Sequence, residues 1–109
     1  MPFTWRININ PNPGGRPTRP AVFEFDQPPD VETGDQVIWS NNDDQAHFPV
    51  PDSPDPTGVG SFMPTQIAPN STSPGFAFGK AGTVKYHCRL HPEETGVIEV
   101  KENEPSVQA

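Results

Sequence analysis

The residues best suited to chemistry lie close together near the end of the chain. Cys88 is the only cysteine; His87 precedes it directly and His91 follows three residues later. A thiolate and an imidazole at this spacing, on a short loop that leaves a strand, can bind one metal ion together. A third ligand must come from elsewhere, and His47 is the only other histidine. One cysteine and two histidines form the trigonal set that copper uses for electron transfer.

The alternation of apolar residues separates the two histidines beside Cys88. Val84, Tyr86 and Cys88 share one face of the predicted strand, which we expect to face the core. His87 then points away from the core and is a weak ligand candidate. His91 lies beyond the strand, where the loop can fold back toward the thiolate. A buried thiolate needs a cation to remain charged, and a copper ion would supply it.

The remaining sequence predicts an all-β framework for these residues. Leucine is nearly absent, and Val, Ile and Phe supply most of the apolar side chains, which favours strands. Sixteen prolines break any long helical pattern. Short alternating runs, such as the one from Phe3 to Ile9, are bounded by turn residues. About seven to eight short strands without a helix indicate a β-sandwich.

The length of 109 residues predicts one domain over residues 1–109. Within it, residues 49–75 are expected to form a long Pro-rich connection, and residues 102–109 a C-terminal tail. The net charge is −7 and no Lys or Arg cluster exists, which argues against nucleic acid as a partner. No apolar run is long enough for membrane insertion. Strand-like sequence follows Met1-Pro2 directly, which indicates a trimmed chain without its signal peptide.

Two stretches of the sequence carry a resemblance to a known family. Residues 34–47, Gly-Asp-Gln-Val-Ile-Trp-Ser-Asn-Asn-Asp-Asp-Gln-Ala-His, resemble the first-ligand motif of cupredoxins such as plastocyanin and amicyanin. Residues 78–82, then Tyr-His-Cys at 86–88, His-Pro at 91–92 and Gly96, look most like amicyanin. The two motifs agree with the family in order and spacing, so the pair is more specific than either motif alone.

The resemblance implies a Greek-key β-sandwich that holds one copper ion and alternates between Cu(I) and Cu(II). It implies His47, Cys88 and His91 as the three strong ligands. It further implies a monomeric electron carrier rather than an enzyme, which exchanges electrons with a donor and an acceptor protein. A periplasmic or otherwise extracytoplasmic location follows from the resemblance only.

This sequence departs from the family at the fourth ligand position. The amicyanin-like pattern has a methionine three residues after the loop histidine, and here that residue is Glu94. A carboxylate oxygen is harder than a thioether and favours Cu(II), so an axial Glu94 predicts a lowered reduction potential. Alternatively, Glu94 points to solvent and copper takes no fourth ligand, a water or a backbone carbonyl. Glu93 is expected to be surface charge, and the methionines, Met1 and Met63, lie outside this loop.

Several residues near the ligands have a supporting role in this interpretation. The family's matching asparagine implies that Asn41 hydrogen-bonds across to the cysteine loop and holds the site; the alternative is an ordinary turn residue. Phe48, Pro49 and Leu90 are expected to surround an exposed edge of His91. They would then either mark the place where electrons leave or only shield copper from water.

Other functions remain open at the level of the sequence. A copper enzyme or a copper-handling protein would use the same ligands with a position open to small molecules. Zinc could occupy the site, although the affinity order of divalent ions favours copper. A Cys-His hydrolase is a weaker hypothesis, because the cysteine is borne on a strand and faces inward, and no oxyanion-hole signal lies near it.

Overall fold

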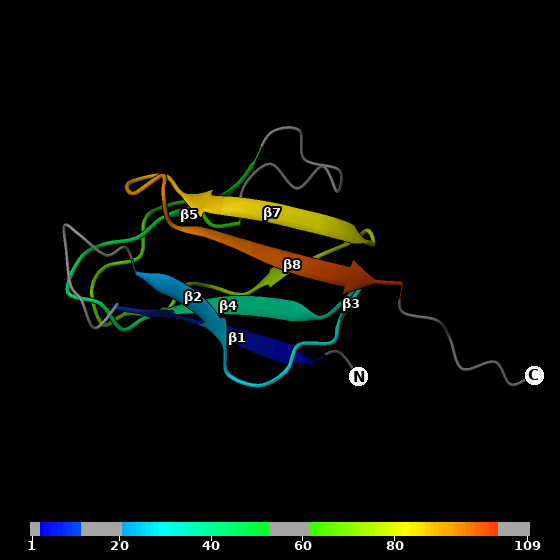
Figure 1. Ribbon diagram of the computed structural model, residues 1–109. Helices are drawn as coiled ribbons and strands as arrows, with labels where there is room; N and C mark the ends of the chain where they lie inside the picture. Colours follow the sequence, from blue (N-terminus) through cyan, green and yellow to red (C-terminus); the bar gives the residue numbers. More distant parts are fainter. Residues whose placement is uncertain (1–2, 12–20, 53–61, 103–109) are drawn as a thin grey trace, which may run out of the picture.

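A computed structural model describes residues 3–11, 21–52 and 62–102 (Figure 1). In these ranges the secondary structure consists of strands. They are β1 (Thr4–Asn10), β2 (Val22–Phe25), β3 (Val31–Glu32), β4 (Gln36–Asn41), β5 (Pro49–Pro51), β6 (Phe76–Ala77), β7 (Gly82–Cys88) and β8 (Thr95–Lys101). In the part of the chain that the structure describes, no helix is both long and apolar enough to cross a membrane.

The strands form two four-stranded sheets that pack face to face (Figure 1). One sheet has the order β2-β1-β4-β6, and the other has the order β3-β8-β7-β5. β1 pairs in parallel with β4, and β3 in parallel with β8, whereas the other neighbours are antiparallel. The chain therefore crosses between the sheets instead of running as simple hairpins, which confirms the all-β Greek-key sandwich.

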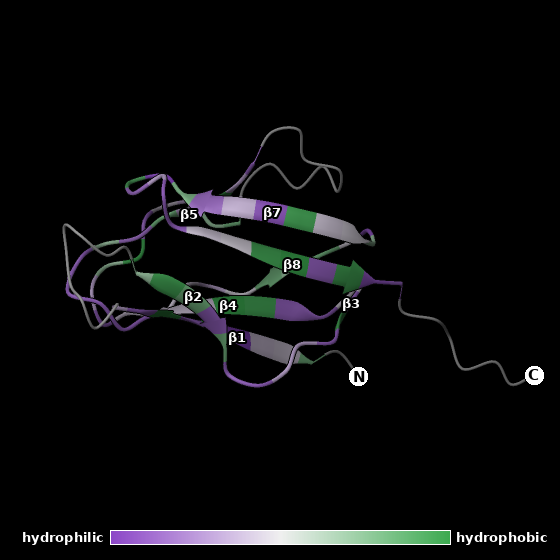
Figure 2. Cartoon of the chain, viewed as in Figure 1, coloured by the Kyte–Doolittle hydropathy of each residue, from purple (hydrophilic) through white to green (hydrophobic). Residues whose placement is uncertain are grey.

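The predicted alternation of side chains is present in the long strands. In β1, Trp5, Ile7 and Ile9 are buried between exposed or half-buried polar residues. In β7, Tyr86 and Cys88 face the core, whereas the intervening polar residues face outward. Figure 2 shows the resulting change between hydrophobic and hydrophilic residues along the strands. Because successive side chains of a strand point to opposite faces, this pattern fixes which side of each sheet is buried.

Aromatic side chains fill the centre of the sandwich. Trp39 and Tyr86 come from opposite sheets and meet edge to face, with ring centroids 5.6 Å apart. The indole Nε1–H of Trp39 donates to the Tyr86 hydroxyl at 3.4 Å. Burial raises the pKa of Tyr86, so the phenol stays neutral. Gly96 lies so close to the Tyr86 ring that a Cβ atom there would collide with it. Tyr86 is thus a core residue, as predicted, and Trp39 is its buried partner.

The range predicted as a long connection contains ordered contacts. Pro49–Pro51 forms β5, and Phe62, Met63 and Ile67 are buried in the core. Ile67 also forms an isolated antiparallel bridge with His47. Residues 53–61 of the connection and residues 103–109 of the predicted tail lie outside the described residues.

Candidate metal centre

The loop between β7 and β8 spaces its three candidate ligands by hydrogen bonds of the main chain. The N–H of His91 donates to the carbonyl of Cys88 at 3.1 Å, and the N–H of Glu94 donates to the carbonyl of His91 at 2.9 Å. The N–H of Cys88 closes the loop on the carbonyl of Glu94 at 2.9 Å. The first two of these bonds each join residues three positions apart, as in a β-turn. Two successive turns therefore bring the side chains of these residues to the same side of the loop.

His47 reaches the same place from the segment between β4 and β5. Its main chain exchanges two hydrogen bonds with Ile67, from His47 N to Ile67 O at 3.1 Å and from Ile67 N to His47 O at 2.7 Å. The side chain of His47 is fully buried. This pairing with a distant segment holds the imidazole in the interior, although the residues before it are polar and read as a loop.

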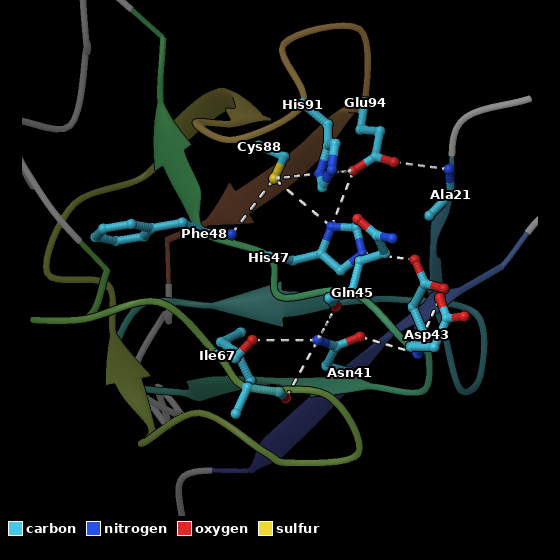
Figure 3. A network of polar contacts seen from close by, with 12 residues as sticks. Ala21, Asn41, Asp43, Gln45, His47, Phe48, Ile67, Cys88, His91 and Glu94 are labelled. Carbon is cyan, nitrogen blue, oxygen red and sulfur yellow. Dashed lines mark hydrogen bonds and ion pairs between the residues drawn. The ribbon is translucent and has the colours of Figure 1, made fainter. Parts of the chain in front are cut away.

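Figure 3 shows how the four predicted ligands converge. The Cys88 Sγ lies 3.6 Å from the Nδ1 atoms of both His47 and His91. The Glu94 Oε1 lies 2.9 Å from His47 Nδ1 and 3.4 Å from His91 Nδ1. One ligand atom from each of the four residues thus falls within 4.8 Å of all the others. The side chain of Glu94 is fully buried and does not point to solvent.

Two contacts tie the cysteine loop to the segment that follows His47. The N–H of Phe48 donates to the Cys88 Sγ at 3.4 Å. The N–H of Arg89 donates to the carbonyl of Phe48 at 2.8 Å. A main-chain donor aimed at a thiolate stabilises its negative charge and fixes its position.

Asp43 holds the second nitrogen of His47. Its Oδ2 lies 2.8 Å from His47 Nε2, and both side chains are buried. When Nε2 carries the proton that Asp43 accepts, Nδ1 is left with a lone pair that faces the cluster. Asp43 was not among the predicted site residues, although an acidic residue four positions before a candidate ligand is a signal that could have found it.

The environment of His47 favours its protonated form when no metal is bound. Burial alone lowers the pKa of the imidazole, but contacts with Cys88 and Asp43 and the negative charge of Glu94 outweigh it. The pKa of His47 is therefore raised above its ordinary value. A metal ion would replace that proton, so metal binding must release it.

The role predicted for Asn41 is wrong. Its amide nitrogen donates to the carbonyls of Gln45, Ile67 and Ala68, and its Oδ1 accepts from the N–H of Asp43. These partners belong to the segment before His47 and to the one that pairs with His47, not to the cysteine loop. Asn41 therefore shapes the loop that carries His47, because it lies at the end of β4 and its side chain meets the carbonyls that converge there.

Among the neighbours of the ligands, His87 lies where alternation predicts, whereas Pro49 is buried and does not belong to the expected apolar surface around His91. His87 faces away from Cys88, and its Nδ1 lies 2.6 Å from Asp52 Oδ1 near the surface. Glu93 is exposed. Leu90 is exposed as well, whereas Phe48 is half-buried and lies beneath the guanidinium of Arg89.

The four side chains fit a divalent metal ion of borderline softness. A thiolate, two imidazoles and a carboxylate are donors that copper and zinc both accept. Packed together without a cation, ionised Cys88 and Glu94 would be costly to bury. A positive ion among them would offset this cost, and the raised pKa of His47 indicates that a proton takes part of that role in the metal-free protein.

The two packed four-stranded sheets form a β-sandwich that matches the cupredoxin fold. Among solved structures, the chain resembles amicyanin. No protein-family model matches the chain, and a search of curated proteins found no match.

Three amicyanin structures illustrate this similarity. An oxidised amicyanin with a proline-to-alanine substitution shares 27% identity over 65% of this chain, with a TM-score of 0.56. The match spans 66% of that protein, just under two thirds of its length. An oxidised amicyanin with a methionine-to-lysine substitution matches 92% of this chain and 82% of its own, at 20% identity and a TM-score of 0.62. Amicyanin from Paracoccus versutus matches 92% of this chain and 81% of its own, at 17% identity and a TM-score of 0.58.

Proposed function

We propose that this protein is a mononuclear copper protein that carries single electrons between redox partners. His47, Cys88 and His91 would be the strong ligands, and Glu94 the axial one. The observation that carries this proposal is the convergence of four ligand atoms, within 4.8 Å, from two segments of the chain. The likeness to amicyanin, of which several similar structures are Cu(I) forms, supports copper over zinc.

An axial Glu94 would favour the oxidised ion. With one thiolate and one carboxylate, the formal charge of the site is zero around Cu(II) and minus one around Cu(I). With a neutral thioether in place of the carboxylate, the neutral state is the reduced one. Because net charge is costly in a buried site, the carboxylate stabilises Cu(II) and lowers the reduction potential.

Electrons would leave the site through His91. It is the most exposed of the four ligands, with 20% of its side chain accessible, whereas His47, Cys88 and Glu94 are buried. Leu90 is 44% exposed beside it and offers an apolar contact for a partner protein. We therefore assign the donor and acceptor proteins to this surface. By its likeness to amicyanin, we also propose that the carrier acts as a monomer, in the periplasm or another extracytoplasmic compartment.

The burial of the ligands favours a carrier over the alternatives. A copper enzyme needs a coordination position that a small molecule can reach, and three of the four ligands are inaccessible to solvent. A Cys-His hydrolase needs an accessible thiol, and Cys88 is fully buried. Azide added to the Cu(II) protein should leave its spectrum unchanged; a shifted spectrum would favour the enzyme.

The decisive experiment compares copper-loaded wild type with Glu94→Met. We expect wild type to show an intense visible charge-transfer band from thiolate to Cu(II), together with an EPR signal from a single copper. Glu94→Met should raise the reduction potential, because it removes an anionic ligand. Glu93→Met is the matched control, because the same substitution one residue earlier changes only an exposed side chain.

Two results would contradict the proposal at different levels. If wild type binds copper without the thiolate band, the Cys-His-His ligand set is wrong. If Glu94→Met and Glu93→Met leave the potential equally unchanged, Glu94 is not an axial ligand, although the copper site itself stands.

A further inference from the structure

The two oxygens of the Glu94 carboxylate lie in different surroundings (Figure 3). Oε2 accepts a hydrogen bond from the main-chain N–H of Ala21 at 2.8 Å. Oε1 faces the imidazoles of His47 and His91, at 2.9 and 3.4 Å. The carboxylate is therefore oriented, with one oxygen held by the protein and the other presented to the cluster.

The donor comes from a distant part of the fold. Ala21 directly precedes β2, which belongs to the opposite sheet from β7 and β8, and it lies 73 residues from Glu94 in sequence. Ala21 is only 4% exposed, so water does not compete strongly for this bond. A main-chain N–H cannot rotate away as a side chain can, and a hydrogen bond to a carboxylate is stronger than one between neutral groups.

We infer that Ala21 is a positioning residue for the axial ligand. Its N–H holds Oε2 away from the metal, so that Glu94 offers Oε1 alone as a single-oxygen ligand. This inference rests on the proposed function, because it assigns a partner to the axial ligand proposed there. It also links the start of β2 to the metal centre, which the sequence motifs of the ligand loops do not reveal.

Substitutions of Ala21 test this role because they can remove the N–H or keep it. Ala21→Pro removes the main-chain N–H that donates to Glu94. Ala21→Gly is the matched control, because it changes the side chain but keeps that N–H. In the Cu(II) proteins, we expect Ala21→Pro to change the EPR hyperfine splitting and the charge-transfer spectrum, and Ala21→Gly to match wild type. Equal spectra for Ala21→Pro and Ala21→Gly would overturn the inference.

Glu94→Gln provides a sharper test, because an amide has only one oxygen. The N–H of Ala21 can pair with the amide oxygen but not with the NH₂ group. In Glu94→Gln alone, the oxygen should stay on Ala21 and the NH₂ should face copper, so the spectrum should match that of Glu94→Leu. In the double variant with Ala21→Pro, the amide can turn its oxygen to copper, and the spectrum should move back toward wild type. Identical spectra for the single and double Gln variants would contradict the inference.

Amide hydrogen exchange of the metal-free protein decides the question if Ala21→Pro does not fold. The Ala21 amide should exchange at the wild-type rate in Glu94→Gln and about 10- to 100-fold faster in Glu94→Leu. The main-chain amide of Asn41, which donates to the Ser71 carbonyl at 2.8 Å, is an internal control whose exchange rate should be the same in all variants. An Ala21 amide equally protected in both variants would overturn the inference.

These readouts separate the inference from the proposed function. If Glu94→Leu changes the copper spectrum but the variants of Ala21 do not, only the positioning role fails. If no thiolate band forms in wild type, the proposed function fails, and the exchange data still report whether Ala21 holds Glu94.

Discussion

Two buried carboxylates, Asp35 and Glu94, have different surroundings. Asp35, just before β4, accepts hydrogen bonds at 3.0 Å from the N–H groups of Phe3 and Glu32 and from the indole of Trp5. Glu94 accepts the N–H of Ala21 at one oxygen and faces two imidazoles and a thiol with the other. The first is surrounded by fixed donors, and the second by groups that themselves bind metal ions.

The difference teaches what each carboxylate is for. Burial alone raises the pKa of Asp35, but the three hydrogen bonds outweigh it, so the pKa of Asp35 is lowered. Its negative charge is therefore stabilised by the fold without any ion. Glu94 lies among groups that could hold a metal ion, and the raised pKa of His47 favours a proton beside it. Asp35 thus serves stability, whereas Glu94 serves the site under the proposed function.

The largest expected effect is on stability and concerns Asp35. Asp35→Ala leaves the buried indole N–H of Trp5 and two main-chain N–H groups without their acceptor, and should destabilise the protein by about 2–4 kcal/mol. Glu94→Gln keeps an oxygen for Ala21 and loses only the charge that faces His47, so it should destabilise the metal-free protein less than Asp35→Ala does. Urea unfolding of both metal-free variants measures this. The comparison breaks if Glu94→Gln is as destabilising as Asp35→Ala.

The next effect concerns copper affinity and extends the comparison to Asp43, a third buried carboxylate. Asp43→Asn keeps the size of the side chain but removes the charge that orients His47 through Nε2, and should weaken Cu(II) binding about 10- to 100-fold. Competition with a chelator of known affinity measures it. Asp44→Asn is the control, because that side chain is exposed. If both variants bind copper as wild type does, Asp43 only shapes the loop.

A change of pH should alter the free energy of unfolding less than Asp35→Ala does, because protonation neutralises a carboxylate without removing it. The lowered pKa of Asp35 means that its stabilisation is present above its ordinary pKa of 3.8 and is lost as the pH falls through the folded-state value. The raised pKa of His47 has the opposite sign: its contribution is complete below pH 6.5 and is lost as the pH rises through the folded-state value.

Urea unfolding of the metal-free protein across this pH range checks both signs. Asp35→Asn should flatten the acid side of the stability profile only, and His47→Gln should flatten the side above pH 6.5 only. A profile in which His47→Gln alters the acid limb instead would mean that His47 is not the group whose stabilisation is lost above pH 6.5.

Much of this arrangement could be predicted from local patterns. Period-two alternation placed Cys88 inward and His87 outward, since neighbouring residues of a strand face opposite sides of the sheet. The three-residue spacing of Cys88, His91 and Glu94 allowed two successive turns, and the hydrogen bonds within the loop have that form. A single sequence is enough to predict these features, because each depends on residues that are close together in the chain.

The contacts that could not be predicted join distant segments. Asn41 was expected to reach the cysteine loop, but its amide meets carbonyls at Ile67 and Ala68, 26 and 27 residues away. The bond between Ala21 and Glu94 uses a main-chain N–H, which every residue except proline has, so no side-chain pattern marks it. Such partners are set by how the sheets pack, and composition or periodicity does not specify them.

The smallest expected effect concerns Asp30, an exposed carboxylate with which the buried Asp35 and Glu94 can be compared. Its Oδ1 lies 2.8 Å from the Lys101 ammonium, as short as the bond between Ala21 and Glu94, but both side chains are more than half exposed. Water and salt screen such a pair, so Asp30→Asn should leave the urea midpoint within error of wild type. A loss comparable to that of Asp35→Ala, abolished by high salt, would show that charge pairing rather than burial distinguishes the carboxylates. Without such a loss, burial among fixed donors is what makes Asp35 stabilising, and burial among groups that could hold a metal ion is what sets Glu94 apart.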